Sequence, residues 1–304
     1  MKLIHKVEEC AVYESNKHSY ASVPLSLNPP VIKTFLLKIT SSSSNVPETA
    51  SALLSNIEKC ILNAVHSHIP SSIKLTSSSI KLTPSSIKFK ALKAVPLKSF
   101  IEDMHSQSMM GAAYTLTLKL LADIGTQLER IRAEHGLIIP FLSLEDIIVI
   151  ERRNKHNNQY KNKGSHDDNH GRLESETESE TESDTESESE SEYVFIFMNA
   201  EKLVPAPNKK ELIVDIPLKV NKHTSFLPAE LPESALRRLP MRVTTTSWQY
   251  SLSALCIYAL LQHKFKNGED DIERVGRPFL HTSLYFCLKR CLKPDPEERV
   301  LLYV

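Results

Sequence analysis

The sequence is poor in glycine, cysteine and long apolar runs, and each shortage excludes a class of protein. The first glycine is Gly111, so no glycine-rich loop in the N-terminal third can bring backbone N–H groups close to a phosphate. Five cysteines, mostly within apolar stretches, do not form a disulfide framework and indicate a reducing compartment. The longest apolar run, Leu252 to Leu261, is too short to span a bilayer, and the N-terminus shows no signal peptide. We therefore expect a cytoplasmic, intracellular protein without a membrane partner.

Net charge is also absent, because 37 basic side chains balance 37 acidic ones. The balance is uneven, since residues 174–192 contain ten acidic side chains and no basic ones. The compensating lysines are scattered over the rest of the chain and form no basic patch interleaved with aromatic residues. A solvated surface explains them, and nucleic acid is not an expected partner.

Hydrophobic periodicity predicts both strands and helices. Residues 31–39 are rich in branched and aromatic side chains, as in a strand. Apolar residues recur at helical spacing over 48–66, and again over 97–104 and 112–134, where Gly136 ends the pattern. A seven-residue repeat (72–76, 79–83, 86–90) alternates as in short strands, and its serines, threonines and Pro84 oppose the alternative of a coiled coil.

Residues 152–192 interrupt this pattern. The segment is first rich in Asn, His, Lys and Gly and then consists almost only of Ser, Thr and acidic residues. Such a composition cannot bury enough apolar area to offset the entropy of ordering, so we predict a disordered acidic insertion between two strands of a hairpin. The low-complexity tracts are typical of large DNA viruses and repeat-prone eukaryotes; for a viral protein, the cytoplasm would be that of the host.

The C-terminal half resembles the eukaryotic protein kinase family. Phe226-Leu-Pro-Ala-Glu230 is similar to the motif that closes the activation segment. Trp248-Gln-Tyr-Ser-Leu-Ser253 is similar to the start of the family's central buried helix. The run Cys287-Leu-Lys-Arg-Cys291-Leu-Lys-Pro-Asp-Pro-Glu-Glu-Arg299 resembles its last helices. The resemblance implies a buried ion pair between Glu230 and Arg299, whereas the alternative places both residues on the surface.

The N-terminal part resembles the same family more weakly. In that family, a strand lysine contacts the nucleotide's phosphates and pairs with a glutamate on the next helix. Lys38, in Phe-Leu-Leu-Lys-Ile-Thr, and Glu58 have the matching order and separation. They are the candidate nucleotide-binding residues. Lys33 is a rival for the lysine, and an ordinary surface Lys and Glu remain the alternative.

The stretches that should carry phosphoryl transfer depart from the family's pattern. Aligned with the catalytic loop, the chain has Phe141 at the position of the base and Asp146 at that of the metal-binding Asn. A phenyl ring cannot accept the proton of a substrate hydroxyl. In the metal-binding motif after Tyr193, Phe197, Met198 and Asn199 occupy the three positions, so that Phe197 replaces the aspartate and Asn199 lies one or two places away. Asp146 and Asn199 are the candidate metal ligands.

These residues lead to an α+β fold with two lobes. A small β-rich N-lobe would span residues 1–97, with one helix at 48–66, and a helical C-lobe would span 98–304 around the insertion. The resemblance implies ATP and magnesium as candidate cofactors. We expect a pseudokinase, a regulatory or scaffolding module that binds a protein partner and has lost most or all phosphotransfer. The alternatives are an atypical active serine/threonine kinase that binds ATP and an unrelated helical scaffold.

Overall fold

The computed structural model describes residues 1–7, 10–15, 33–39, 48–66, 81–83, 86–106, 110–153, 191–206, 211–214, 218–231 and 239–300. The predicted disordered insertion lies outside these residues except at its two ends. There, β9 (Ile147–Arg153) and β10 (Ser191–Phe197) pair antiparallel, so the strands on either side of the insertion form a hairpin.

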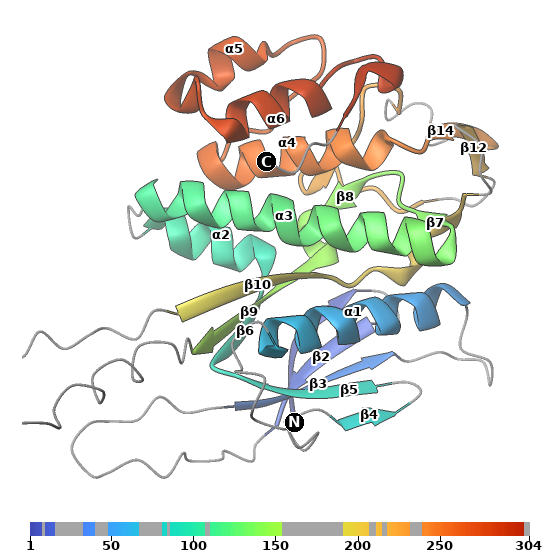
Figure 1. The fold of residues 1–304 in the computed structure, drawn as a ribbon, viewed down its shortest axis with the longest axis vertical. Coiled ribbons are helices and arrows are strands. Elements are labelled where there is room, and N and C mark those ends of the chain that lie inside the picture. The colour runs from blue at the N-terminus through green and yellow to red at the C-terminus, as the bar shows by residue number, and fades with distance from the viewer. Residues whose placement is uncertain are drawn as a thin grey trace, which may run out of the picture.

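The N-terminal region is a five-stranded antiparallel sheet covered by one helix (Figure 1). Its strand order is β1-β2-β3-β5-β4. The helix α1 (Glu48–His66) follows β3 and has the bounds expected from the sequence. The strands are β1 (Lys2–Val7), β2 (Cys10–Glu14), β3 (Lys33–Ile39), β4 (Lys81–Thr83) and β5 (Ser86–Ala91). The last two copies of the seven-residue repeat therefore form paired strands, and the first lies outside the described residues.

Strand alternation explains how this sheet packs. Phe35 and Leu37 of β3 are almost fully buried and share a core cluster with Leu53 and Ile57 of α1. The Phe35 ring stacks on Phe89 of β5 with centroids 5.6 Å apart. Since neighbouring residues of a strand point to opposite faces, the apolar side of β3 contacts α1.

A second sheet and a long helix form the middle of the molecule (Figure 1). The strand order is β10-β9-β6, with β6 at Lys93–Pro96. Next to it lie α2 (Leu97–Ser106) and α3 (Met110–His135). The side chain of Gln127 on α3 donates to the carbonyl of Phe195 and accepts from the N–H of Phe197, and Asp123 accepts from the N–H of Phe195. These bonds satisfy the backbone of β10, an edge strand.

The C-terminal region is mainly helical. Its centre is α4 (Ser247–Leu261), which is buried on nearly every side, with α5 (Ile272–Val275) and α6 (Ser283–Cys291) above it in Figure 1. Cys287 and Cys291 lie in this core, as expected of packing residues. Three two-stranded ladders join the loops: β7 (Leu137–Ile138) with β11 (Val204–Pro205), β8 (Leu142–Ser143) with β13 (Ser225–Phe226), and β12 (Glu211–Val214) with β14 (Met241–Thr244).

The α+β class predicted from the sequence is confirmed. The described part has a β-rich N-terminal region and a helical C-terminal region, as expected from the sequence. Among the described helices, none has the length and apolar character needed to cross a bilayer.

Glu230 and Arg299 form a bidentate ion pair, and Glu230 also accepts a hydrogen bond from Ser247, the first residue of α4. The two guanidinium nitrogens donate to the two carboxylate oxygens over 2.7 and 2.6 Å. Arg299 also donates to the carbonyls of Lys293 and Pro294. Burial raises the pKa of Glu230, but hydrogen bonds from Arg299 and Ser247 outweigh it and hold that pKa below its ordinary value. The carboxylate therefore stabilises the fold at neutral pH and loses this effect as the pH falls through the lowered pKa.

We predict that Arg299→Ala lowers the free energy of unfolding by about 3–5 kcal/mol, because the fully buried guanidinium leaves an unpaired carboxylate behind. Urea denaturation at pH 7 measures the change. Arg290→Ala, at an exposed position of α6, is the control and should change the value by less than about 0.5 kcal/mol. Equal effects of the two substitutions would show that the ion pair does not hold the C-terminal region together.

Candidate functional site

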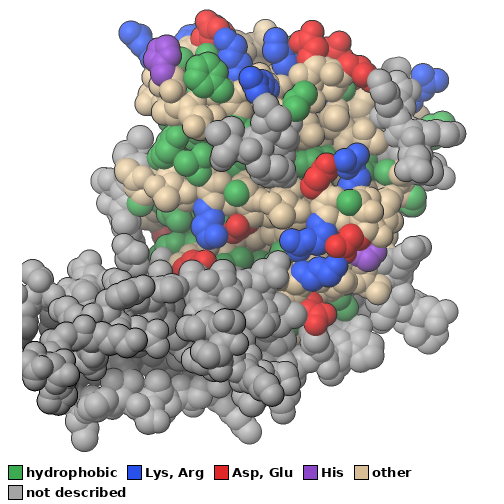
Figure 2. Space-filling model, in the orientation of Figure 1, with side chains coloured by type: hydrophobic (Ala, Val, Ile, Leu, Met, Phe, Trp, Pro, Cys, Tyr) green, Lys and Arg blue, Asp and Glu red, His purple; other side chains and the backbone are tan. Residues whose placement is uncertain are grey.

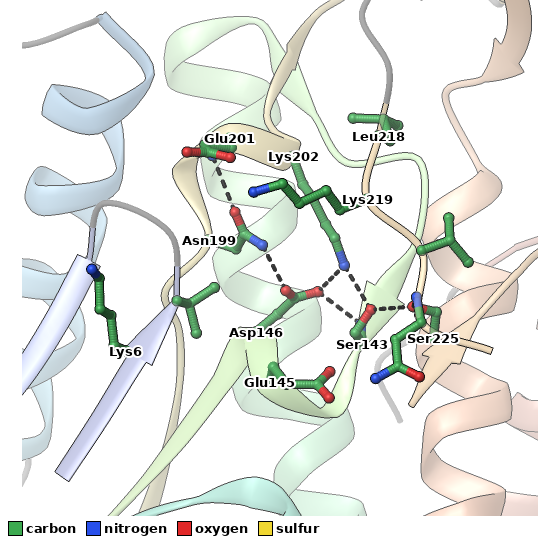
Figure 3. Close-up of a pocket in the computed structure, with 13 residues that line it drawn as sticks. Lys6, Ser143, Glu145, Asp146, Asn199, Glu201, Lys202, Leu218, Lys219 and Ser225 are labelled. Carbon is green, nitrogen blue, oxygen red and sulfur yellow. Dashed lines mark hydrogen bonds and ion pairs between the residues drawn. The ribbon is translucent and has the colours of Figure 1, made fainter. Parts of the chain in front are cut away.

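A cavity of about 580 Å³ opens between the first strand and the loops of the C-terminal region (Figure 3). Lys6 and Val7 at the end of β1 line one side. The opposite side comes from three loops, which contribute Ser143, Glu145, Asp146, Asn199, Glu201, Lys202, Leu218, Lys219, Val220, Asn221 and Ser225. Its volume lies within the range of small-molecule sites, about 300–1,000 Å³.

Backbone pairing brings two distant loops together at this cavity. Ser143 in β8 lies opposite Ser225 in β13, and their hydroxyl oxygens are 2.8 Å apart. The N–H of Leu144 donates to the carbonyl of Thr224, just before β13. On the side of the sheet, the ring of His5 in β1 donates from Nε2 to the carbonyl of Glu145 over 2.7 Å. The loop that carries Asp146 is therefore held from both sides.

Asp146 is the centre of the site. It ends a short 3-10 helix, Leu144–Asp146, and its side chain is almost completely buried. One carboxylate oxygen, Oδ2, accepts from the N–H of Ser143 and from the ammonium of Lys202, both over 2.7 Å. The other oxygen, Oδ1, accepts from the amide of Asn199 over 2.8 Å. Three donors thus compensate for the burial of this charge.

Lys202 is the second buried charge, and it lies in the short 3-10 helix Ala200–Lys202. Only 7% of its side chain is exposed. Besides Asp146, its ammonium donates to Ser143 Oγ over 2.7 Å (Figure 3). The ammonium also lies 4.3 Å from the centre of the Phe141 ring, within the range of a cation–π contact. Phe141, which the alignment placed at the position of the base, thus lies against a lysine.

The structure brings the two candidate metal ligands, Asp146 and Asn199, into direct contact. Phe197, which the alignment placed at the position of the metal-holding aspartate, is instead fully buried in β10 opposite Ile147. Asn199 also caps the 3-10 helix by accepting from the N–H of Glu201 over 3.1 Å. The side chain that meets Asp146 is therefore Asn199, the second candidate, and not the residue at position 197.

The structure does not bring the two candidate nucleotide-binding residues together. Lys38 follows buried Leu37 along β3, so it lies on the face of the sheet away from α1, and it is exposed. Glu58 lies on α1, and within the described parts of the chain no ion pair joins it to Lys38. The rival, Lys33, pairs with Glu14 of β2 over 3.0 Å. None of these four residues lines the cavity.

These contacts decide whether the cofactors implied by the resemblance fit. The lysine expected to contact ATP phosphates does not reach the cavity, and Lys6, Lys202 and Lys219 are the lysines that do. A magnesium ion needs oxygen ligands at about 2.0–2.1 Å in octahedral geometry. Asp146 Oδ2 already holds two donors, one of them a full positive charge. The described residues, in this arrangement, do not fit a magnesium ion.

No motif or periodicity in the sequence pointed to Lys202, Ser143 or Ser225. Lys202 stands among Ala, Glu and Leu in a segment that reads as an ordinary turn, and lysines are usually exposed. Only the folded chain shows that this lysine supplies an ammonium to Asp146.

No protein-family model matches the sequence, and no curated protein does either. Among solved structures, the chain is similar to the kinase domain of a Toxoplasma gondii-specific rhoptry antigen. The identity is 12% and the TM-score 0.42, over 99% of this chain and 76% of that one. A rhoptry kinase from the same organism is also similar, with 12% identity and a TM-score of 0.45, over 99% of this chain and 73% of that one. Similarity at this level assigns no activity to the chain.

We predict that Lys202→Met lowers the free energy of unfolding by about 3–5 kcal/mol, because it leaves the Asp146 carboxylate buried and without its charge partner. Adding Asp146→Asn should restore part of that loss, since the unpaired charge is then gone. Chemical denaturation of both single variants and the double variant gives the coupling between the two residues. Lys6→Met, at an exposed lysine of the same cavity, is the matched control and should change the value by less than about 0.5 kcal/mol. Additive losses would mean that the two side chains do not interact.

Proposed function

We propose that this protein is a pseudokinase: a kinase-like module that regulates or scaffolds a protein partner and transfers no phosphate. The observation that carries the proposal is the pair formed by Phe141 and Lys202. A phenyl ring lies at the position of the base, fully buried, and an ammonium lies over its face. Neither group can accept a proton from a substrate hydroxyl at neutral pH.

The other requirements of phosphoryl transfer point the same way. Catalysis of this reaction is mostly positioning and electrostatic stabilisation around metal ions and a phosphate-contacting lysine. Here the only carboxylate at the candidate metal position, Asp146, is bound to Lys202, and Lys38 faces away from α1. The sequence between β1 and β2 contains no glycine that would let backbone N–H groups approach a phosphate closely.

A role in binding agrees with how firmly the loops of the site are held. The segment 218–231 is attached to the catalytic-loop region through β8 and β13 and through Ser251, which accepts from the N–H of Leu142 and donates to the carbonyl of Phe226. A surface fixed in this way loses little conformational entropy when a partner binds. Charges of both signs are interspersed on the face drawn in Figure 2, over the described residues. Such a surface does not favour a polyanion.

The alternative, an atypical serine/threonine kinase that binds ATP, has one observation in its favour. Asp146 and Asn199 meet at the edge of a cavity that is large enough for a small molecule, and Glu145 lines the same cavity. In an active enzyme, these oxygens would have to exchange Lys202 for a metal ion.

We predict that the full chain, with ATP and either Mg²⁺ or Mn²⁺, transfers no labelled phosphate to itself or to generic protein substrates above a no-enzyme background. Phe141→Asp should not create activity, because its carboxylate would lie next to Lys202 and form another ion pair. The decisive control is Asp146→Asn. Transfer by the wild type that disappears in this variant would replace the pseudokinase with the active-kinase alternative.

A further inference from the structure

The cation next to the Asp146 carboxylate is a side chain of the protein itself, the ammonium of Lys202. Lys202 Nζ is 2.7 Å from Asp146 Oδ2 and 2.7 Å from Ser143 Oγ, with the Phe141 ring behind it. These are two oxygen ligands of the kind that Mg²⁺ and Mn²⁺ prefer. An ion bound to the same two oxygens would occupy the place of the ammonium, so the two cations exclude each other.

We propose that Lys202 is a built-in substitute for a divalent cation, and that it conceals a metal site formed by Asp146 and Ser143. Lys202 is the charge partner of the Asp146 carboxylate, so removing the ammonium leaves a negative charge with only two neutral donors, the N–H of Ser143 and the amide of Asn199. A divalent cation restores that compensation. Such an ion keeps several water ligands, and the adjoining cavity has room for them.

The neighbouring groups support this exchange. Asn199 holds Asp146 Oδ1, and the N–H of Ser143 holds Oδ2, so the carboxylate keeps its orientation when Lys202 is removed. Ser143 Oγ stays next to Ser225 Oγ, whose own position is fixed by a bond from the N–H of Asn221. The oxygens therefore remain in place for a new cation. Cation binding and phosphate transfer are measured independently, so failure of one proposal leaves the other untouched.

The test measures Mn²⁺ binding by the full chain through the loss of the free-ion signal in electron paramagnetic resonance. The wild type should bind no Mn²⁺ at this site. Lys202→Ala should bind one ion per chain, at least tenfold more tightly than the wild type, and should melt at a higher temperature with Mn²⁺ than with EDTA. Adding Asp146→Asn to that variant should abolish both effects. Lys6→Ala, which removes a different lysine from the cavity, should behave as the wild type does.

A second variant covers the case in which Lys202→Ala does not fold without metal. Lys202→Gln removes the charge but keeps a hydrogen-bond donor, on a side chain one bond shorter. Binding by either variant, or Mn²⁺-dependent refolding followed by circular dichroism, supports the proposal. Two outcomes overturn it: the wild type binds Mn²⁺ and loses it in Asp146→Asn, or neither Lys202 variant responds to Mn²⁺.

Discussion

The contact between Asp146 and Lys202 is the interaction on which the site depends. Two oppositely charged side chains are withdrawn from water, and each would be costly to bury alone. Their contact is sustained by donors from Ser143 and Asn199, and these tie three loops to one point. The pair therefore acts as a structural link between these loops at the edge of the cavity.

This pair and Phe141 form one complementary arrangement. The Lys202 ammonium lies over the buried Phe141 ring and also contacts the Asp146 carboxylate, so one side chain makes both a cation–π contact and an ion pair. Replacing Lys202 would remove both contacts at once.

Much of the fold was predictable because it depends on local patterns. The helix at 48–66, the strand around Phe35 and the hairpin on either side of the insertion follow from periodicity, and the site of Glu230 and Arg299 follows from motif order. The site was less predictable. Asp146 and Asn199 were selected by alignment. The contact of Lys202 with Asp146 depends on how two loops pack, and the hydrophobic periodicity of the sequence does not predict loop packing. Lys38 and Glu58 were also selected by resemblance, and in this structure Lys38 lies on the exposed face of β3, away from α1.

The most direct measurement is a crystal structure of the wild-type protein grown or soaked with Mn²⁺, with data collected to locate the ion by anomalous scattering. We expect the Lys202 ammonium to lie between Asp146 and Ser143, and no anomalous peak to lie within bonding distance of the Asp146 carboxylate. A manganese ion bound to that carboxylate, with Lys202 turned away into solvent, would contradict this expectation.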